Sequence, residues 1–418
     1  MTDEFVAKLN GDYHSAMVDR GALEQALREQ GEDFFRHVTE HCPHLFASVP
    51  LFVSTAQVEQ MRTVIAAVEH VVALPAWRDA VLQQAPEFVH HAPHAKGVFF
   101  GYDFHLNADG AHLIEINTNA GGAFLNSLLL QSQREVVMPG VAAAPDNLEQ
   151  IFLAMFRNEW RLERGDAPLQ TVAIVDEQPQ QQYLYPEFLL AQRMFERVGI
   201  TALIADPTEL EVRADGLYCR ERKVDLIYNR LTDFFLQQHT ALSAVFQNND
   251  LAVITPHPWA YALYADKYNL TAFTSVDSLR AMGARDVDTA VLQAGVPQTK
   301  RVRAEEDGQW WQERKQWFFK PASGFGSKGT YRGANVTHRV FAEIMQGGYV
   351  AQRMALPGAR AVCGDGGELA VFKSDVRCYV YDGQVQLIAA RLYQGQMTNF
   401  RTVNGGFAQV RIVNQGVE

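Results

Sequence analysis

The chain has 418 residues, 47% of them hydrophobic and 20% charged, which is ordinary for a globular protein of one to three domains. Its formal net charge of −11 argues against a general binder of nucleic acids or anionic membranes, because such binders depend on clustered Lys and Arg. The first residues, MTDEFVAKLN, lack the apolar region of a secretory signal, and no apolar stretch is long enough to span a bilayer. The four cysteines show no paired spacing, which favours reduced thiols. We therefore expect a cytoplasmic protein with no nucleic-acid and no membrane partner.

Residues 1–95 are predicted to be mainly helical, because apolar residues recur there at helical spacing, as between Thr55 and Val72. The next segment, 96–135, begins with two apolar-alternating runs, GVFFGYDFHL and AHLIEIN. They flank an Asp-Gly turn at 109–110, and this pattern predicts a β-hairpin. The helical first segment carries no readable chemistry, so we expect it to cap the rest of the molecule or to mediate homo-oligomerisation.

Residues 165–262 have the pattern of an α/β unit. TVAIVD, ITALIA and VDLIYNR are predicted strands, and a helix is predicted from Tyr185 to Val198 between the first two. Strands that alternate with helices indicate a mostly parallel sheet. Arg230 ends the third strand, at the edge where open α/β sheets bind ligands, so it is a candidate substrate contact.

The last segment, 263–418, is predicted to be an α+β region that ends in a sheet. A helix is expected near Asp266, and the strand WFFKP, a glycine-rich loop and the strand GYVAQRM follow it. The tail contains further strand patterns, ELAVFKS, VRCYVYDG, QVQLIAARLY and FAQVRIV. The chain as a whole is therefore predicted to be an α/β (α+β) protein.

The strongest chemical signal is the segment KPASGFGSKGT, which starts at Lys320. Glycines let backbone N–H groups turn toward an anion, and a lysine before the loop adds a positive charge, so the segment suits a polyphosphate. It is not a P-loop, because the lysine precedes the glycines. The alternative is a surface loop with no ligand. The residues of this segment expected at the phosphates are Lys320, Ser323, Gly324, Gly326, Ser327 and Gly329.

Oxygen-bearing side chains lie together on the predicted hairpin. Asp103 is on its first strand, and Glu115 and Asn117 share one face of the second, because side chains alternate along a strand. Two carboxylates and an amide oxygen make a site of hard ligands that suits magnesium. The alternative is an exposed hairpin face with ordinary polar residues.

Together, the lysine segment and the hairpin resemble the ATP-grasp superfamily. In that family a lysine-bearing strand and a glycine-rich loop close over the phosphates of ATP, and an acidic residue followed by E-x-N holds magnesium. Lys267, followed by GVPQT, resembles the family's earlier phosphate-contacting lysine segment. YVAQRMALPG resembles the hinge strand that receives adenine, with Gln352 in place of the usual ribose-binding glutamate. An amide can also hydrogen-bond a hydroxyl group.

The tail of the chain resembles the sheet that completes the ATP-grasp site. The matching residues are Asp375, Arg377, Arg391 and Asn404-Gly405-Gly406. In the usual family the acidic residue and E-x-N come after this sheet, whereas here they come first. The order is similar to that of the circularly permuted ATP-grasp proteins, which include glutathionylspermidine-synthase-like proteins. Permutation is tolerated where the original chain ends lie close together.

The resemblance implies an ATP- and Mg²⁺-dependent ligase that activates a small-molecule carboxylate as an acyl phosphate and joins it to an amine. Peptide-forming relatives carry an arginine two residues before the first magnesium aspartate, and Gly101 holds that place here. We expect Arg391 or Arg401 to take over its role, and Gly121 to offer a backbone N–H to the developing oxyanion. Two alternatives stay open: a phosphotransferase on the same scaffold, and a catalytically silent nucleotide-binding module.

Overall fold

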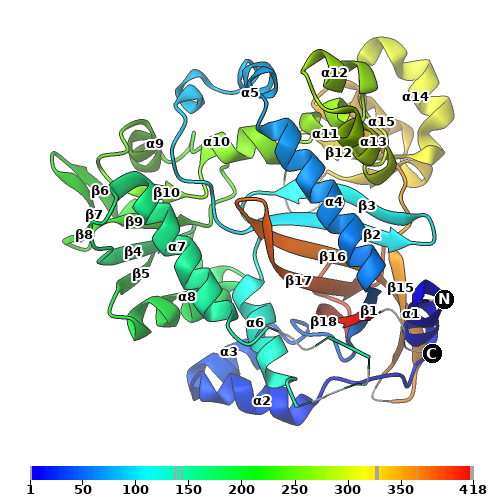
Figure 1. Ribbon diagram of the computed structural model, residues 1–418, viewed down its shortest axis with the longest axis horizontal. Coiled ribbons are helices and arrows are strands. Elements are labelled where there is room, and N and C mark those ends of the chain that lie inside the picture. The colour runs from blue at the N-terminus through cyan, green and yellow to red at the C-terminus, as the bar shows by residue number, and fades with distance from the viewer. Residues whose placement is uncertain are drawn as a thin grey trace.

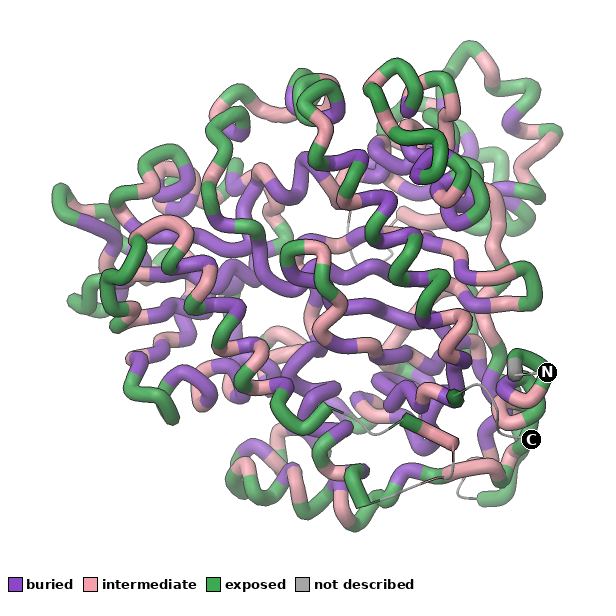
Figure 2. Tube along the Cα trace, in the orientation of Figure 1, coloured by how far each residue is buried: buried purple, intermediate pink, exposed green. Residues whose placement is uncertain are grey.

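The computed structural model describes residues 2–135, 138, 140–142, 145–324, 329–364 and 366–414. Within this part of the chain the strands form four sheets, and helices cover or connect them (Figure 1). The fold is therefore mixed α/β, as the sequence predicted. Figure 2 shows that buried residues follow the strands at the centre of the molecule, whereas the outer helices and turns carry the exposed residues. No described helix combines the length and the apolar character that a membrane crossing requires.

The largest sheet joins the two ends of the chain. Its order is β1-β18-β17-β16-β2-β3, and β15 pairs with β16 beside β2. The strands are β1 (Leu51–Ser54), β2 (Phe100–Asn107), β3 (Gly110–Asn117), β15 (Gly358–Cys363), β16 (Leu369–Tyr381), β17 (Gln384–Tyr393) and β18 (Gly406–Val413). The predicted hairpin is thus present as β2 and β3, and it extends a sheet made mostly of C-terminal strands.

The N-terminal segment is helical, as predicted, except that β1 enters the large sheet. Its helices are α1 (Thr2–Gly11), α2 (Arg20–Glu29), α3 (Glu32–His41), α4 (Thr55–Val72) and α5 (Pro75–Leu82). The β1 strand pairs in parallel with β18, with Leu51 opposite Val410. Helix α4 starts with a capping box between Ser54 and Gln57, and its apolar side packs on the sheet face that carries Tyr102. The opposite face of the hairpin is thereby left for polar side chains.

The second sheet is parallel throughout, with the order β10-β9-β4-β5. Its strands are β4 (Thr171–Val175), β5 (Thr201–Ala205), β9 (Leu226–Asn229) and β10 (Val253–Thr255). The helices around it are α6 (Ala123–Ser132), α7 (Leu148–Arg164), α8 (Tyr185–Arg197) and α9 (Thr240–Gln247). A small antiparallel sheet follows β5, made of β6 (Leu210–Arg213), β7 (Gly216–Cys219) and β8 (Arg222–Val224). The α/β pattern predicted for this segment is present.

The fourth sheet carries Lys320 and has the order β11-β14-β12-β13. Its strands are β11 (Thr299–Arg301), β12 (Trp317–Pro321), β13 (Tyr331–Arg332) and β14 (Tyr349–Arg353). The helices of this segment are α10 (Pro258–Ala260), α11 (Tyr268–Phe273), α12 (Val276–Ala281), α13 (Asp286–Gly295), α14 (Asp307–Glu313) and α15 (His338–Met345). A π-helical turn, η4 (Tyr261–Ala265), ends just before the helix predicted near Asp266, which is α11. Such π turns often occur at functional positions.

Candidate active site

A cavity of about 450 Å³ lies where the large sheet meets the sheet of Lys320. The predicted site residues that line it are Asp103, Glu115, Asn117, Lys267, Lys320, Gly324, Gln352 and Arg391. They come from five separate segments of the sequence. The fold therefore brings the lysine segments and the hairpin face to one cavity.

One wall of the cavity carries two lysines. Lys320, at the end of β12, is 8% exposed, and its Nζ donates to Gln352 Oε1 at 2.8 Å and to the Ile114 carbonyl at 3.0 Å. Burial lowers the pKa of Lys320 to about 8, although the nearby Glu115 carboxylate acts in the opposite direction. Lys267 donates to the Gly324 carbonyl at 3.0 Å, and its Nζ lies 3.8 Å from Glu115 Oε2. Both ammonium groups thus face the cavity next to a single carboxylate.

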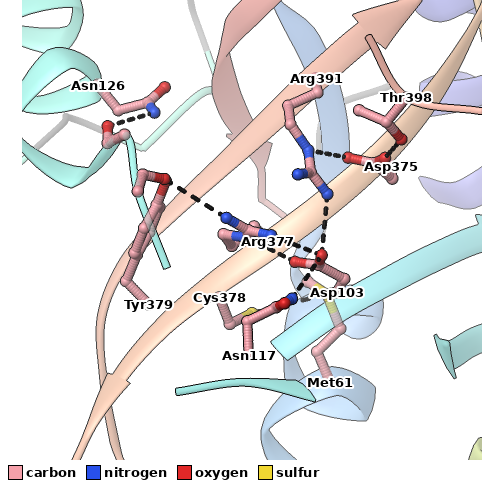
Figure 3. Close-up of polar contacts among 12 residues, drawn as sticks. Met61, Asp103, Asn117, Asn126, Asp375, Arg377, Cys378, Tyr379, Arg391 and Thr398 are labelled. Carbon is pink, nitrogen blue, oxygen red and sulfur yellow. Dashed lines mark hydrogen bonds and ion pairs between the residues drawn. The ribbon is translucent and has the colours of Figure 1, made fainter. Parts of the chain in front are cut away.

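The opposite wall is organised around Asp103 (Figure 3). Its Oδ1 accepts from Arg377 Nε at 2.6 Å, and its Oδ2 accepts from Arg377 Nη2 at 2.7 Å and from Arg391 Nη2 at 2.9 Å. Burial alone would raise the pKa of Asp103, but the two arginines lower it to about 2. Arg391 also donates to Asp375 Oδ1 at 2.7 Å. Two carboxylates and two guanidinium groups therefore form one buried charge network.

Strand pairing explains this network. Arg377 lies directly opposite Asp103 in the β16–β2 pair, and Asp375 lies opposite Arg391 in the β16–β17 pair. Because side chains alternate along a strand, Asp375 and Arg377 point to the same face of the sheet. The spacing Asp-x-Arg is the sequence signal that could have placed Arg377 in the site itself rather than in its supporting sheet.

Gly101 leaves room for the guanidinium of Arg377. A Cβ atom on Gly101 would lie 2.9 Å from Arg377 Nε and 2.7 Å from the Cβ of Ala120. From the sequence, Arg391 or Arg401 is expected to replace the arginine that peptide-forming ATP-grasp proteins carry at the position of Gly101. The structure brings Arg391 to the cavity and adds Arg377, which passes over Gly101 from the neighbouring strand.

The three residues predicted as magnesium ligands, Asp103, Glu115 and Asn117, all line the cavity but differ in their hydrogen-bond partners. Both oxygens of Asp103 accept hydrogen bonds from arginines, and Asn117 Nδ2 donates to Oδ2 as well, at 3.2 Å. Glu115 and Asn117 also line the cavity, and the Glu115 carboxylate lies 3.8 Å from the ammonium group of Lys267. Among the described residues no group of three or more His, Cys, Asp or Glu side chains could hold a metal. Magnesium commonly takes one or two protein oxygens together with phosphate oxygens and water, so the pair of Glu115 and Asn117 fits it.

Several predicted residues are not among those that line the cavity, namely Gly121, Ser323, Gly329, Arg401 and Asn404. Asn404 Oδ1 accepts from Arg20 of α2 at 2.8 Å, and the side chain of Arg401 is exposed. Gly121 lies behind Arg377, and its carbonyl accepts from the Tyr379 hydroxyl at 2.7 Å. Two further predicted residues, Gly326 and Ser327, fall outside the described residues.

Other lining residues carried no separate signal in the sequence analysis, among them His105, Arg332, Lys373, Tyr393 and Thr398. His105 Nδ1 lies 2.8 Å from the Ala355 carbonyl, which ties the hairpin to the segment after β14. Thr398 Oγ1 donates to Asp375. These five residues come from strands and loops that meet at the cavity only in the folded chain. Their positions at the cavity therefore depend on the whole fold.

Comparison with known proteins gives a fold but no sequence family. No family model matches the chain, and no curated protein matches its sequence. Among solved structures, a glutathione synthetase-like effector from Globodera pallida in its apo form aligns over 97% of this chain and 99% of its own, with a TM-score of 0.60 and 10% identity. A proposed γ-glutamylcysteine synthetase from Methylobacillus flagellatus KT aligns over 84% and 86%, with a TM-score of 0.45 and 10% identity. The chain has a fold of the ATP-grasp type, and the glutathione synthetase-like effector shares it along nearly its whole length.

Proposed function

We propose that this protein is an ATP-dependent ligase that activates a carboxylate as an acyl phosphate and joins it to an amine. One observation carries the proposal: a single cavity combines two buried lysines, a carboxylate beside an amide side chain, and two arginines held by carboxylates. Bound Mg-ATP would supply the phosphoryl group and the charge that neutralises it. Phosphoryl transfer to a carboxylate depends mainly on positioning and charge stabilisation, so the proposed reaction requires no nucleophilic triad.

Each side chain has a role that follows from its surroundings. Lys320 and Lys267 would bind the phosphate chain, and Glu115 with Asn117 would hold magnesium. Arg377 and Arg391 are fixed by Asp103 and Asp375, so their remaining N–H groups are oriented before a substrate arrives. Such preorganised donors stabilise charge that develops in a transition state. We assign them to the reacting carboxylate and its phosphorylated form.

We also propose that the chain is a circular permutation of the usual ATP-grasp order. The support is the pairing of the N-terminal strand β2 with the C-terminal strand β16, which places Asp103 next to Arg377 across 274 positions of sequence. In an unpermuted order the hairpin would follow this sheet along the chain. A permutation keeps the contacts of the sheet and changes only the connection.

Thermal unfolding with and without Mg-ATP tests nucleotide binding. A ligand at 100 times its Kd should stabilise the protein by about 2.7 kcal/mol. We expect a clear rise of the unfolding temperature for the natural chain and a much smaller rise for Lys320→Ala. Lys315→Ala, which removes an exposed lysine from the turn before β12, is the matched control and should respond like the natural chain.

Release of ADP in the presence of a panel of acids and amines then tests the reaction. Release that requires both an acid and an amine supports the ligase. Phosphorylated product without an amine requirement would instead indicate a phosphotransferase. Nucleotide binding without any turnover would indicate a silent binding module, and no thermal shift at millimolar Mg-ATP would contradict nucleotide binding itself.

A further inference from the structure

Arg230 is a buried cation that the protein itself does not neutralise by a direct ion pair. It follows β9 and is 7% exposed, yet none of the salt bridges among the described residues involves it. Its Nη1 donates one long hydrogen bond, 3.3 Å, to the Asn119 carbonyl, and its Nε has no hydrogen-bond partner in the described part of the chain. A buried charge without such partners costs free energy unless a ligand supplies them.

Aromatic rings hold this guanidinium in place. Its central carbon lies 5.3 Å from the ring centre of Tyr228 and 6.0 Å from that of Phe188. The hydroxyl of Tyr228 is also buried without a hydrogen-bond partner among the described residues. Two donors with unused hydrogen-bonding capacity therefore lie side by side at the carboxyl end of the parallel sheet, where folds of this kind bind ligands.

The carboxyl groups near Arg230 have other partners. Glu187 accepts from the backbone N–H of Gly122 at 2.7 Å and from that of Phe124 at 3.2 Å. Asp176, at the end of β4, accepts from the N–H of Glu177 at 2.9 Å. Burial raises the pKa of Asp176 to about 7, although Arg230 acts against this rise. Burial acts to lower the pKa of Arg230, but Tyr228, Glu187 and Asp176 raise it, so the guanidinium stays charged without a direct ion pair among the described residues.

Gly121 separates Arg230 from the main cavity. The Gly121 carbonyl lies 3.4 Å from Arg377 Nη1, which belongs to the cavity wall, and a Cβ on Gly121 would lie 2.9 Å from Arg230 Nη2. The neighbouring Asn119 and Leu184 are partly exposed, as is Gly121. A substrate that passes over Gly121 would meet one arginine on each side.

We propose that Arg230 binds a carboxylate group of a substrate, distinct from the carboxylate that reacts, in a subsite across Gly121 from Arg377. The planar fork of arginine matches the two oxygens of a carboxylate. This inference rests on the proposed ligase function. The second carboxylate belongs either to the acid or to the amine substrate, and the KM that rises in an Arg230 variant identifies which of the two carries it.

Thermal unfolding with a matched pair of probes tests the subsite without knowledge of the substrates. Succinate carries two carboxylates, and succinamide has the same shape without charge. At fixed free magnesium and with Mg-ATP present, succinate should raise the unfolding temperature of the natural chain more than succinamide does. In Arg230→Met the concentration of succinate for a half-maximal shift should rise on the order of 10- to 100-fold. Arg193→Met, on the same helix as Glu187, is the control and should keep the difference.

Two further measurements separate this role from a structural one. Without ligand, Arg230→Met should unfold at the same temperature as the natural chain or at a higher one, because an apolar side chain replaces a poorly paired buried charge. A fall of several degrees would assign Arg230 to stability and overturn the proposal, as would an equal response of the natural chain to both probes. The shift with Mg-ATP alone should be unchanged in Arg230→Met. If the natural chain lacks that shift, the ligase proposal fails, whereas the succinate comparison still reports on Arg230.

Discussion

Lys320 and Gln352 form a direct hydrogen bond, 2.8 Å long, in which a buried ammonium group meets a neutral amide. Gln352 is itself 2% exposed and donates to Thr299 Oγ1 at 3.3 Å, so its orientation is fixed. A neutral partner does little to offset the cost of burying the lysine charge. The side chain of Lys320 therefore gains or loses its proton near pH 8.

The affinity for ATP should fall as the pH rises through 8. The pKa of Lys320 is lowered to about 8, so its ammonium form predominates below that pH and is lost above it. Loss of a charged hydrogen bond to a phosphate weakens binding by roughly tenfold or more. Calorimetric titration with Mg-ATP between pH 6.5 and 9.5 measures this step. Lys320→Met should bind weakly at every pH and show no step near 8; an unchanged profile in that variant would assign the step to another group.

Gln352→Glu should move this step to higher pH. A carboxylate placed 2.8 Å from the Lys320 Nζ favours the charged lysine and raises its pKa. The same titration series should then give a midpoint at least about one unit above that of the natural chain. Gln309→Glu, an exposed change on α14, is the control that adds one negative charge elsewhere. A midpoint that stays near 8 in Gln352→Glu would show that Lys320 does not set it.

Asp103→Asn should strongly destabilise the fold at neutral pH. The substitution leaves Arg377 and Arg391 buried with one negative partner fewer, and breaking a buried pair costs about 3–5 kcal/mol. The pKa of Asp103 is lowered to about 2, so its contribution is present above the ordinary aspartate pKa and is lost as the pH falls through 2. Denaturant unfolding should therefore show a large difference between the two proteins at pH 7. That difference should shrink between about pH 4 and pH 2; a small difference at pH 7 would mean that the arginines find other partners.

Glu115→Gln should affect magnesium-dependent binding far more than folding. Glu115 lines the cavity, and the nearby lysines act against burial to lower its pKa, so it is ionised at neutral pH. We expect the magnesium concentration for half-maximal ATP binding to rise at least about tenfold. Glu343→Gln on α15, which removes a carboxylate far in sequence from the β2–β3 hairpin, is the control and should leave the magnesium dependence unchanged. Equal magnesium dependence in Glu115→Gln and the natural chain would remove Glu115 from the proposed metal site.

Two parts of the site could be predicted, the hairpin and the lysine-bearing strand, because each is encoded by a short stretch of sequence. The Asp-Gly turn and the alternation around it placed Asp103, Glu115 and Asn117 on one hairpin, and the lysine before a glycine-rich loop marked β12. Neither pattern contains the partner of Asp103, because Arg377 lies 274 positions later and meets it only through the register of β16 on β2. The aspartate was therefore predicted as a metal ligand, whereas the structure pairs it with arginines.

Contacts between residues far apart in the sequence also explain why some predicted site residues are not among those that line the cavity. Asn404 has a positive φ of 62° and bonds to Arg20, which is 384 positions away. Its motif is present in the sequence, but the position of its side chain depends on a contact with an N-terminal helix. Fold class and strand patterns follow from short-range regularities, while side-chain partners across sheets require the tertiary structure.

The shared sheet also has a consequence for synthesis of the chain. Strand β1 ends at Ser54, but its partner β18 begins at Gly406, so about 350 residues must leave the ribosome before the two can pair. At 5–20 residues per second this takes on the order of tens of seconds. Until then the hairpin and β1 expose unpaired backbone edges, which can associate with other chains. Chaperone dependence and yield on expression should accordingly be governed by the last strand to emerge rather than by the nucleotide-binding segments.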